Sequence, residues 1–233
     1  MSKDYLFTSE SVSEGHPDKI CDRISDTVVD LMLEKYPEAR VACETMVSTN
    51  RTIIAGEYRL PNGMEISNNE IEKHVRKAVK DIGYEQENYH WEKMHFECHL
   101  HSQSENIALG VDQSGNKDEG AGDQGLMFGF ACDETDDLMP APIHYSHKIL
   151  KEMSKLRHAD RNSFLLPDSK SQITLKYQNG KPVKASSIVV STQHVQDCSQ
   201  RDIKDLVRNV LKKVLPEGWM CPEDEFYVNP TGI

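Results

Sequence analysis

The organisation of the chain follows from one stretch near its start, Ser9-Glu10-Ser11-Val12-Ser13-Glu14-Gly15-His16-Pro17-Asp18-Lys19. Pro17 suits the first position of a helix, because its missing N–H would have no partner there. Apolar residues then follow at helical spacing, at Ile20, Ile24, Val28 and Leu31. We therefore predict a helix from about Pro17 to Lys35, with the polar stretch leading into its N-terminus.

The start of this helix has the chemistry of a phosphate-binding corner. Free backbone N–H groups and the positive end of the helix dipole attract an anion, and Gly15 allows the backbone to come close to it. His16 and Lys19 add side-chain donors. Asp18 fits beside an anion if it holds a divalent metal, such as Mg²⁺, that bridges to the phosphates. The alternative is a capped surface helix whose acidic first turn complements the dipole, and spacing alone does not decide between the two.

Composition limits the classes of function. The chain has 233 residues, a net charge of -11 and a pI near 5.4, which argues against nucleic acid or an anionic membrane as its main partner. Its six cysteines are scattered, so neither a zinc site nor a disulfide framework is expected, and a reduced cytoplasmic location fits best. The N-terminus is polar and no long apolar run occurs, so we expect neither a secretory signal nor a membrane span.

Two β-rich runs, Val41 to Val47 and Arg51 to Leu60, predict a hairpin closed by Ser48-Thr49-Asn50. Glu44 and Glu57 lie among apolar neighbours in these runs, where an unpaired carboxylate is costly. Each is therefore expected to have a partner. A cation, a substrate ammonium group and an ordinary Arg or Lys side chain all satisfy this requirement.

A second helix is predicted from Asn68 to its stop at Gly83, followed by a strand over Met94 to Leu100. His99 and His101 would point to the same face near the end of that strand. A two-His metal site is one interpretation of this pair, but no third ligand is in view, and ordinary surface histidines fit the pattern better.

The segment from Ser102 to Gly122 is rich in Gly, Asn, Ser and Asp, and loops of this length are usually functional lids or disordered links. Gly120-Ala121-Gly122-Asp123-Gln124-Gly125 closes it with a backbone that can approach a ligand closely. The alternative is a tight turn into a strand over Leu126 to Ala131.

The second half of the chain repeats the order helix, hairpin, helix, strand. Its predicted elements are a helix after Pro140 that runs to about Arg157, strands at Ile173–Tyr177 and Ile188–Thr192, a helix capped by Ser199, and a strand at Glu225–Val228. The repeat predicts an α/β fold of the α+β type, with two pseudo-repeated units of helices packed on mixed or antiparallel sheet.

Asp168 and Lys170 precede the second hairpin, where Lys170 could reach a phosphate; an ordinary turn is the alternative.

Four blocks of sequence resemble the methionine adenosyltransferase family, also called S-adenosylmethionine synthetase. They are Phe7–Lys19, Gly120–Gly129, Asp168–Gln172 and Val190–His194. The blocks are long, and the resemblance covers essentially the whole chain in order. It implies a transferase that makes S-adenosylmethionine from ATP and L-methionine and then hydrolyses the bound triphosphate, with Mg²⁺ and K⁺ as cofactors.

The resemblance also assigns residues, by motif. His16 and Lys170 contact ATP together with Asp168 and Ser169, and Asp123 lies in the catalytic site. Asp18 binds Mg²⁺ and Glu44 binds K⁺, while Glu57 and Gln103 hold methionine. This chemistry suits the residue types present: the methionine thioether has no proton to lose, so attack on the ribose C5′ needs no general base. The triphosphate leaving group needs cations and fixed donors instead.

Members of this family have three similar units. The resemblance predicts an N-terminal unit over 3–104, a gating loop over 105–122 and a central unit over 123–233, with the third unit absent. Ile233 stands where the family usually has Arg or Lys. The chain is thus expected to be a fragment or a short relative, and a non-catalytic nucleotide-binding or subunit-like remnant is the alternative function. Family active sites lie between subunits, which implies a homodimer or homotetramer.

Overall fold

The computed structural model describes residues 4–61, 64–102, 126–160 and 163–231. The chain forms two compact units, one made of residues 1–19 and 131–233 and the other of residues 20–130. We call the first the four-stranded unit and the second the three-stranded unit, after their sheets. Residues 4–19 thus pack with the second half of the chain, while the sequence-based division into an N-terminal unit over 3–104 and a central unit over 123–233 stays a prediction.

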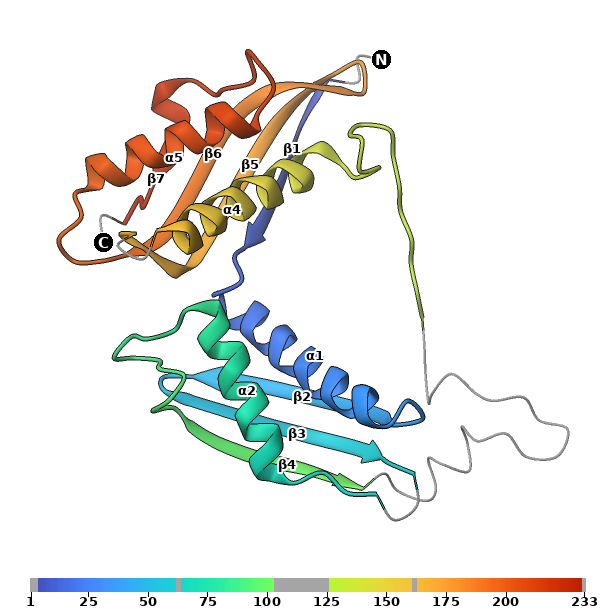
Figure 1. Ribbon diagram of the computed structural model, residues 1–233. Helices are drawn as coiled ribbons and strands as arrows, with labels where there is room; N and C mark the ends of the chain where they lie inside the picture. The colour runs from blue at the N-terminus through green and yellow to red at the C-terminus, as the bar shows by residue number, and fades with distance from the viewer. Residues whose placement is uncertain (1–3, 62–63, 103–125, 161–162, 232–233) are drawn as a thin grey trace, which may run out of the picture. The chain divides into compact units, whose positions relative to one another are not determined.

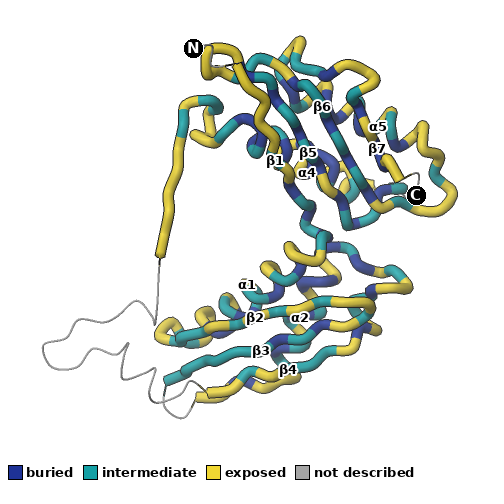
Figure 2. The backbone as a smooth tube through the Cα atoms, turned by 180° about the vertical axis from the view of Figure 1, so that it is seen from behind, coloured by how far each residue is buried: buried dark blue, intermediate teal, exposed yellow. Residues whose placement is uncertain are grey.

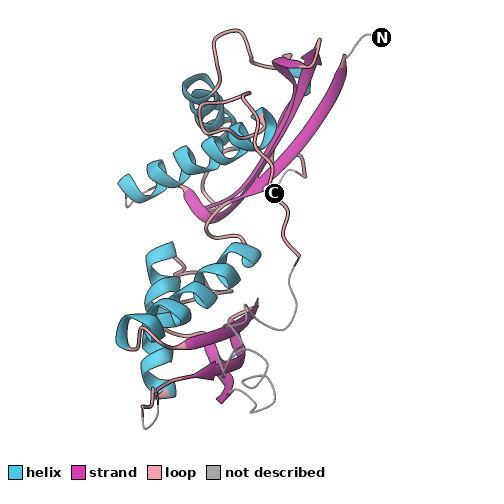
Figure 3. Cartoon of the chain, turned by 90° about the vertical axis from the view of Figure 1, so that its right-hand side faces the viewer, coloured by secondary structure: helices cyan, strands magenta, loops and turns pink. Residues whose placement is uncertain are grey.

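The three-stranded unit packs two helices on one face of a sheet (Figures 1 and 3). Strands β2 (Arg40–Ser48) and β3 (Arg51–Arg59) form the predicted antiparallel hairpin, and β4 (His95–Ser102) lies parallel to β3. Helices α1 (Pro17–Lys35) and α2 (Asn68–Ile82) have the bounds predicted from their apolar spacing. The core between helices and sheet includes Ile24, Val28, Met32, Ile54, Ile71 and Val75.

The four-stranded unit is also a layer of helices on a sheet, with strand order β1-β5-β6-β7 (Figure 1). Its elements in chain order are β1 (Tyr5–Val12), α4 (Ala141–Ala159), β5 (Leu165–Gln178), β6 (Lys181–His194), α5 (Gln200–Val214), the 3₁₀ turn η1 (Glu223–Glu225) and β7 (Phe226–Val228). Neighbouring strands are antiparallel except β6 and β7, which are parallel. Its core joins Ile149, Ile173, Ile188, Val207 and Leu211 from both helices and both long strands.

Apart from the extra strand β1, the two units share one topology, which agrees with the predicted internal repeat and the α+β class. In each, an antiparallel hairpin is followed by a helix and then by a strand parallel to the second hairpin strand. The helix in that connection is capped by a serine in both cases. Ser67 accepts a hydrogen bond from the Glu70 N–H, and Ser199 accepts one from the Asp202 N–H.

Two expectations about strands were incomplete or wrong. Strand β1 was not predicted, because most of its second half is polar; it forms by pairing with β5, from Tyr5 opposite Tyr177 to Val12 opposite Lys170. The strand predicted over Leu126 to Ala131 does not form. This segment is apolar, but its residues are largely exposed (Figure 2), and no neighbouring strand pairs with it within the described residues. Apolar composition alone cannot satisfy backbone N–H and C=O groups.

Candidate functional site

The turn between β1 and α1 lies directly on the start of β5. The Ser13 N–H donates to the Ser169 carbonyl at 2.8 Å, the Ser13 hydroxyl donates to the Pro167 carbonyl at 2.7 Å, and the Ser169 N–H donates to the Ser13 Oγ at 2.8 Å. A Cβ atom on Gly15 would lie 2.3 Å from the carbonyl carbon of Pro167. Only glycine allows the two backbones to approach this closely.

His16 caps the helix that follows. Its backbone N–H donates to the Ser13 carbonyl at 3.0 Å, and its Nδ1 accepts from the Asp18 N–H at 3.2 Å. Because Nδ1 accepts, the ring proton is on Nε2, which is left as a donor. The Asp18 carboxylate is 86% exposed and lies 3.7 Å from Nδ1. The helix is therefore capped by His16, and the alternative role left for the Asp18 carboxylate is to complement the helix dipole.

Strand β5 brings Asp168, Ser169 and Lys170 to the corner formed by the β1–α1 turn and His16. Ser169 is buried and bonded to Ser13, while Lys170 is exposed. Among the residues that the structure describes, Asp168 Oδ1 is the buried side-chain atom that has no hydrogen-bond partner. Burial raises the pKa of Asp168, and the nearby His16 and Lys170 oppose this shift. A buried acceptor without a donor is unusual in a folded protein and suits a ligand or cation that supplies the missing contact.

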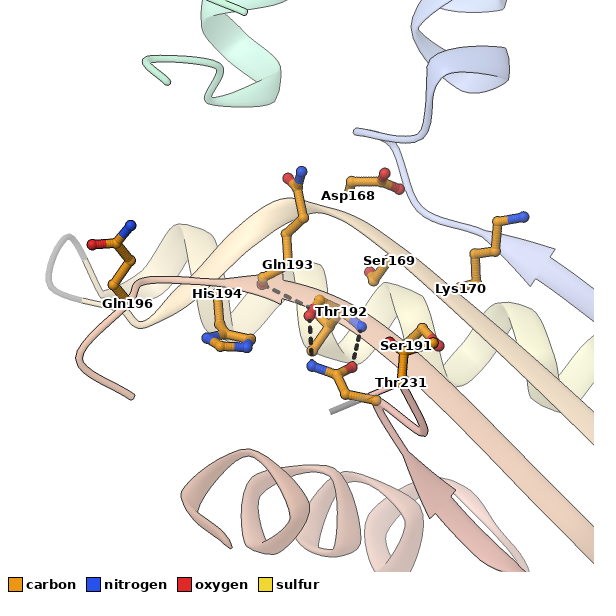
Figure 4. A pocket seen from close by; sticks show the side chains of 10 residues that line it. Asp168, Ser169, Lys170, Ser191, Thr192, Gln193, His194, Gln196 and Thr231 are labelled. Carbon is orange, nitrogen blue, oxygen red and sulfur yellow. Dashed lines mark hydrogen bonds between the residues drawn. The ribbon is translucent and has the colours of Figure 1, made fainter. Parts of the chain in front are cut away.

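A cavity of about 430 Å³ opens beside these residues (Figure 4). Its wall combines the ends of β5 and β6 with the chain after β7, through Asp168, Ser169, Lys170, Ser191, Thr192, Gln193, His194, Gln196, Asn229 and Thr231. Strand register explains why β6 contributes, because Ser169 pairs with Thr192 and Lys170 with Ser191. The block Val190–His194 was noted in the sequence, but no site role was given to its residues.

Asn229 is a further cavity residue that sequence reasoning missed. Its backbone is left-handed, with φ of 44°, and its side chain accepts from the Thr192 N–H at 2.8 Å and donates to the Thr192 carbonyl at 3.1 Å. This pair of bonds fixes the chain that leads to Thr231 against β6 (Figure 4). The local signal was Asn before Pro at the end of an apolar strand, which is typical of a turn.

Glu44 and Glu57 lie in the other unit, on the sheet face that the helices leave open. Glu44 is exposed and Glu57 half-buried, so the expectation that both carboxylates lie in apolar surroundings was wrong for Glu44. Ala42 pairs with Glu57 and Glu44 with Ala55, which makes the two carboxylates diagonal neighbours on one face. Neither is bonded to an Arg or Lys within the described part of the chain.

The remaining candidates from the sequence are two histidines of β4 and residues in or near the predicted gating loop. His99 and His101 do share one face of β4, and His99 Nε2 lies 3.5 Å from a carboxylate oxygen of Glu97. Across the described ranges, no group of three or more His, Cys, Asp or Glu side chains is arranged to hold a metal ion. Gln103, Asp123 and the predicted gating loop lie outside the described residues.

Comparison with known proteins identifies the family. Residues 4–105 match the model of the S-adenosylmethionine synthetase N-terminal domain, and residues 118–233 match that of the central domain. The chain belongs to the S-adenosylmethionine synthetase family. It is 61% identical over 228 residues to the S-adenosylmethionine synthase of Rhodospirillum centenum, and equally identical to that of Maricaulis maris. The synthase of Parvibaculum lavamentivorans is 60% identical over 228 residues.

Coverage differs between this chain and its synthetase relatives. These alignments cover 98% of the chain but 58% of each relative. The chain therefore spans less than two thirds of their length. None of the helices described here is long and apolar enough to span a membrane.

Proposed function

We propose that this chain carries the nucleotide-binding part of a methionine adenosyltransferase, which transfers the adenosyl group of ATP to the sulfur of L-methionine. One observation carries the proposal. In a member of the S-adenosylmethionine synthetase family, His16, Asp168 and Lys170 meet around one corner, where Asp168 Oδ1 is buried without a partner. Donors, a cation and an unsatisfied acceptor at one place suit a metal-bound triphosphate.

Each residue of the corner makes a different proposed contact with ATP. His16 Nε2 donates to a phosphate oxygen, since its Nδ1 is occupied by the helix cap. Lys170 supplies a mobile positive charge from the exposed side of β5. Ser169 has its N–H bonded to Ser13, so its hydroxyl would contact the nucleotide. Asp123, outside the described residues, would complete the catalytic group.

The carboxylates present fit Mg²⁺ as a partner of the phosphates. Mg²⁺ keeps several waters and is usually held by one or two carboxylates together with substrate phosphates, so it does not need a group of three protein ligands. Asp18 offers an exposed carboxylate at the helix start, and Asp168 offers its unsatisfied oxygen. When bound, the ion would neutralise charge on the triphosphate as it leaves.

Methionine and K⁺ would use residues outside this corner. We propose Glu57, together with Gln103, for the methionine, because a carboxylate is the natural partner of the substrate ammonium group. Glu44 would hold K⁺ through its exposed carboxylate. The open sheet face fits both roles, since it presents two carboxylates that no described Arg or Lys neutralises.

The proposed reaction needs no general base. The thioether sulfur attacks ribose C5′ with a lone pair, the C5′–O bond breaks, and the electrons go to the triphosphate. What the chain must supply is orientation and stabilisation of the leaving group, which His16 and Lys170 provide as donors. Hydrolysis of the bound triphosphate to phosphate and diphosphate completes the proposed cycle. A cytoplasmic homodimer or homotetramer is part of the same proposal.

A second candidate function is nucleotide binding without turnover. The corner of His16, Asp168 and Lys170 and the cavity beside it would suffice for this function, because nucleotide binding alone does not need the proposed methionine residues Glu57 and Gln103. A protein that binds ATP and makes no product would act as a subunit or binding module.

One experiment separates the two functions. The purified chain is incubated with ATP, L-methionine, Mg²⁺ and K⁺, and S-adenosylmethionine is quantified by mass spectrometry, with calorimetric ATP titration in parallel. Product above the level seen with Lys170→Ala supports the transferase. ATP binding without product supports the second candidate, and neither binding nor product contradicts both.

A further inference from the structure

Glu14 stands in the same turn as His16 but makes its contacts with helix α4. One carboxylate oxygen, Oε1, accepts from the Ser154 hydroxyl, from Arg157 Nη2 at 2.5 Å, and lies 2.8 Å from His158 Nε2. All three partners belong to the last two turns of α4. Glu14 therefore ties the turn to a helix whose other contacts build the core of the four-stranded unit.

The contact is more than a surface ion pair. The Arg157 side chain is 11% exposed, so its guanidinium is largely withdrawn from water and needs a compensating charge. Burial by itself raises the pKa of Glu14. The hydrogen bonds from Ser154 and His158 and the charge of Arg157 outweigh this effect, so the pKa of Glu14 lies below its ordinary value. Glu14 is thus held in its charged form, with three donors at one atom.

The residues on either side of His16 carry no polar side chain that could hold the turn. Gly15 has no side chain, and Pro17 has no N–H to donate. Upstream of His16, Ser13 is bonded to β5 and Glu14 is bonded to α4, so the turn is anchored to both neighbouring elements. Loss of the Glu14 anchor would remove the bonds that join this part of the turn to the end of α4, while the bonds of Ser13 to β5 would remain. His16 would then sample more positions relative to Asp168.

We propose that Glu14 is a positioning residue: its contacts with Ser154, Arg157 and His158 hold the turn that presents His16 to the triphosphate of ATP. This inference rests on the proposed function, because it takes ATP as the ligand of the corner. It gives Glu14 no contact with the nucleotide. Residues that orient binding groups in this way typically change affinity by about ten- to a hundredfold when they are replaced.

The test compares Glu14→Gln with a matched control on the same helix. Glu152 of α4 is also largely buried and accepts from Lys213 of α5, but it has no bond to the turn. ATP affinity with Mg²⁺ is measured by calorimetry for wild type, Glu14→Gln and Glu152→Gln. We expect the dissociation constant to rise about tenfold for Glu14→Gln and to change less than twofold for Glu152→Gln.

A second readout does not depend on ATP. The ring signals of His16, assigned with His16→Asn, are followed by NMR in the ligand-free chain. We expect Glu14→Gln to shift and broaden them and Glu152→Gln to leave them in place. If wild type fails to bind ATP, the proposed function fails, and the His16 signals still decide whether Glu14 holds the turn.

Two results would overturn the inference. One is a Glu14→Gln variant with wild-type ATP affinity; the other is weakened binding while the His16 signals stay unchanged. If Glu14→Gln does not fold, Arg157→Lys takes its place, because it keeps the charge and loses the planar donor group. The same two readouts then apply, with a smaller loss of affinity and a shift of the same His16 signals expected.

Discussion

Asp168 keeps one buried carboxylate oxygen without a hydrogen bond in the ligand-free chain. Because this charge is poorly compensated, we predict that Asp168→Asn stabilises the free protein by about 1 kcal/mol. The same variant should lose most of its Mg²⁺-dependent ATP affinity. Urea unfolding and ATP calorimetry measure the two effects, and Asp224→Asn, the same change at an exposed carboxylate of η1 away from the cavity, serves as the control. A variant that is less stable and still binds ATP normally would show that Asp168 has a structural role instead.

Gly15 sets the distance between the β1–α1 turn and β5. A methyl group at this position would lie 2.3 Å from the backbone of Pro167, which no side-chain rotation can relieve. We predict that Gly15→Ala destabilises the chain by about 2 kcal/mol and weakens ATP binding. Gly129→Ala is the control, since nothing lies within 4 Å of a Cβ there. Equal thermal stability of the two variants would contradict the proposed close approach.

At the scale of elements, α4 carries two histidines that make its packing dependent on pH. Burial lowers the pKa of His144, and the charge of Lys148 lowers it further, while Asp137 and Asp136 partly oppose the shift. Burial and the charge of nearby Lys19 lower the pKa of His147. The folded state therefore binds fewer protons than the unfolded chain just below the ordinary pKa of 6.5. Stability is fully present above that pH and is lost as pH falls below it.

We predict that the free energy of unfolding declines between about pH 6.5 and pH 5, before carboxylates titrate. His147→Gln keeps a hydrogen-bonding group near Ser11, to which His147 Nδ1 is bonded at 2.6 Å, and removes one titration. The variant should show a shallower decline in urea unfolding across this range. A decline as steep as that of wild type would mean that His147 does not contribute.

Elements with their own local signals could be predicted from sequence, and those that depend on distant partners could not. Helices α2 and α5 carry a serine cap and an apolar stripe, so their bounds followed from the chain itself. Strand β1 exists because β5 is beside it, and the apolar segment 126–131 lacks such a neighbour among the described residues.

The residues of the functional site also divide into those with a local sequence signal and those that only the fold brings together. His16, Asp18 and Lys170 stand in recognisable motifs, whereas Asn229 and Thr192 join the cavity only through strand register and a left-handed backbone. Glu44 was given buried surroundings because its neighbours are apolar, but strand alternation places it on the open face.

For the whole molecule, each sheet has one face that its helices leave uncovered. Large apolar side chains are exposed on these sheets, among them Leu6 at 59% and Met46 at 56%. We predict that the chain forms a homodimer or larger assembly that covers this surface. Multi-angle light scattering at micromolar concentration should show it, and Leu6→Gln should weaken it more than Leu33→Gln on α1. A monodisperse monomer would contradict this prediction.

We propose that the corner formed by His16, Asp18, Asp168 and Lys170 binds the triphosphate of ATP together with Mg²⁺. Asp18→Asn tests it most directly, because the substitution keeps the size of the side chain and leaves the His16 cap in place. Calorimetric titration of ATP is carried out with and without Mg²⁺ on wild type and variant. We predict tighter binding with Mg²⁺ in wild type and loss of that difference in a variant of unchanged stability. An equal Mg²⁺ dependence in both proteins would contradict the claim.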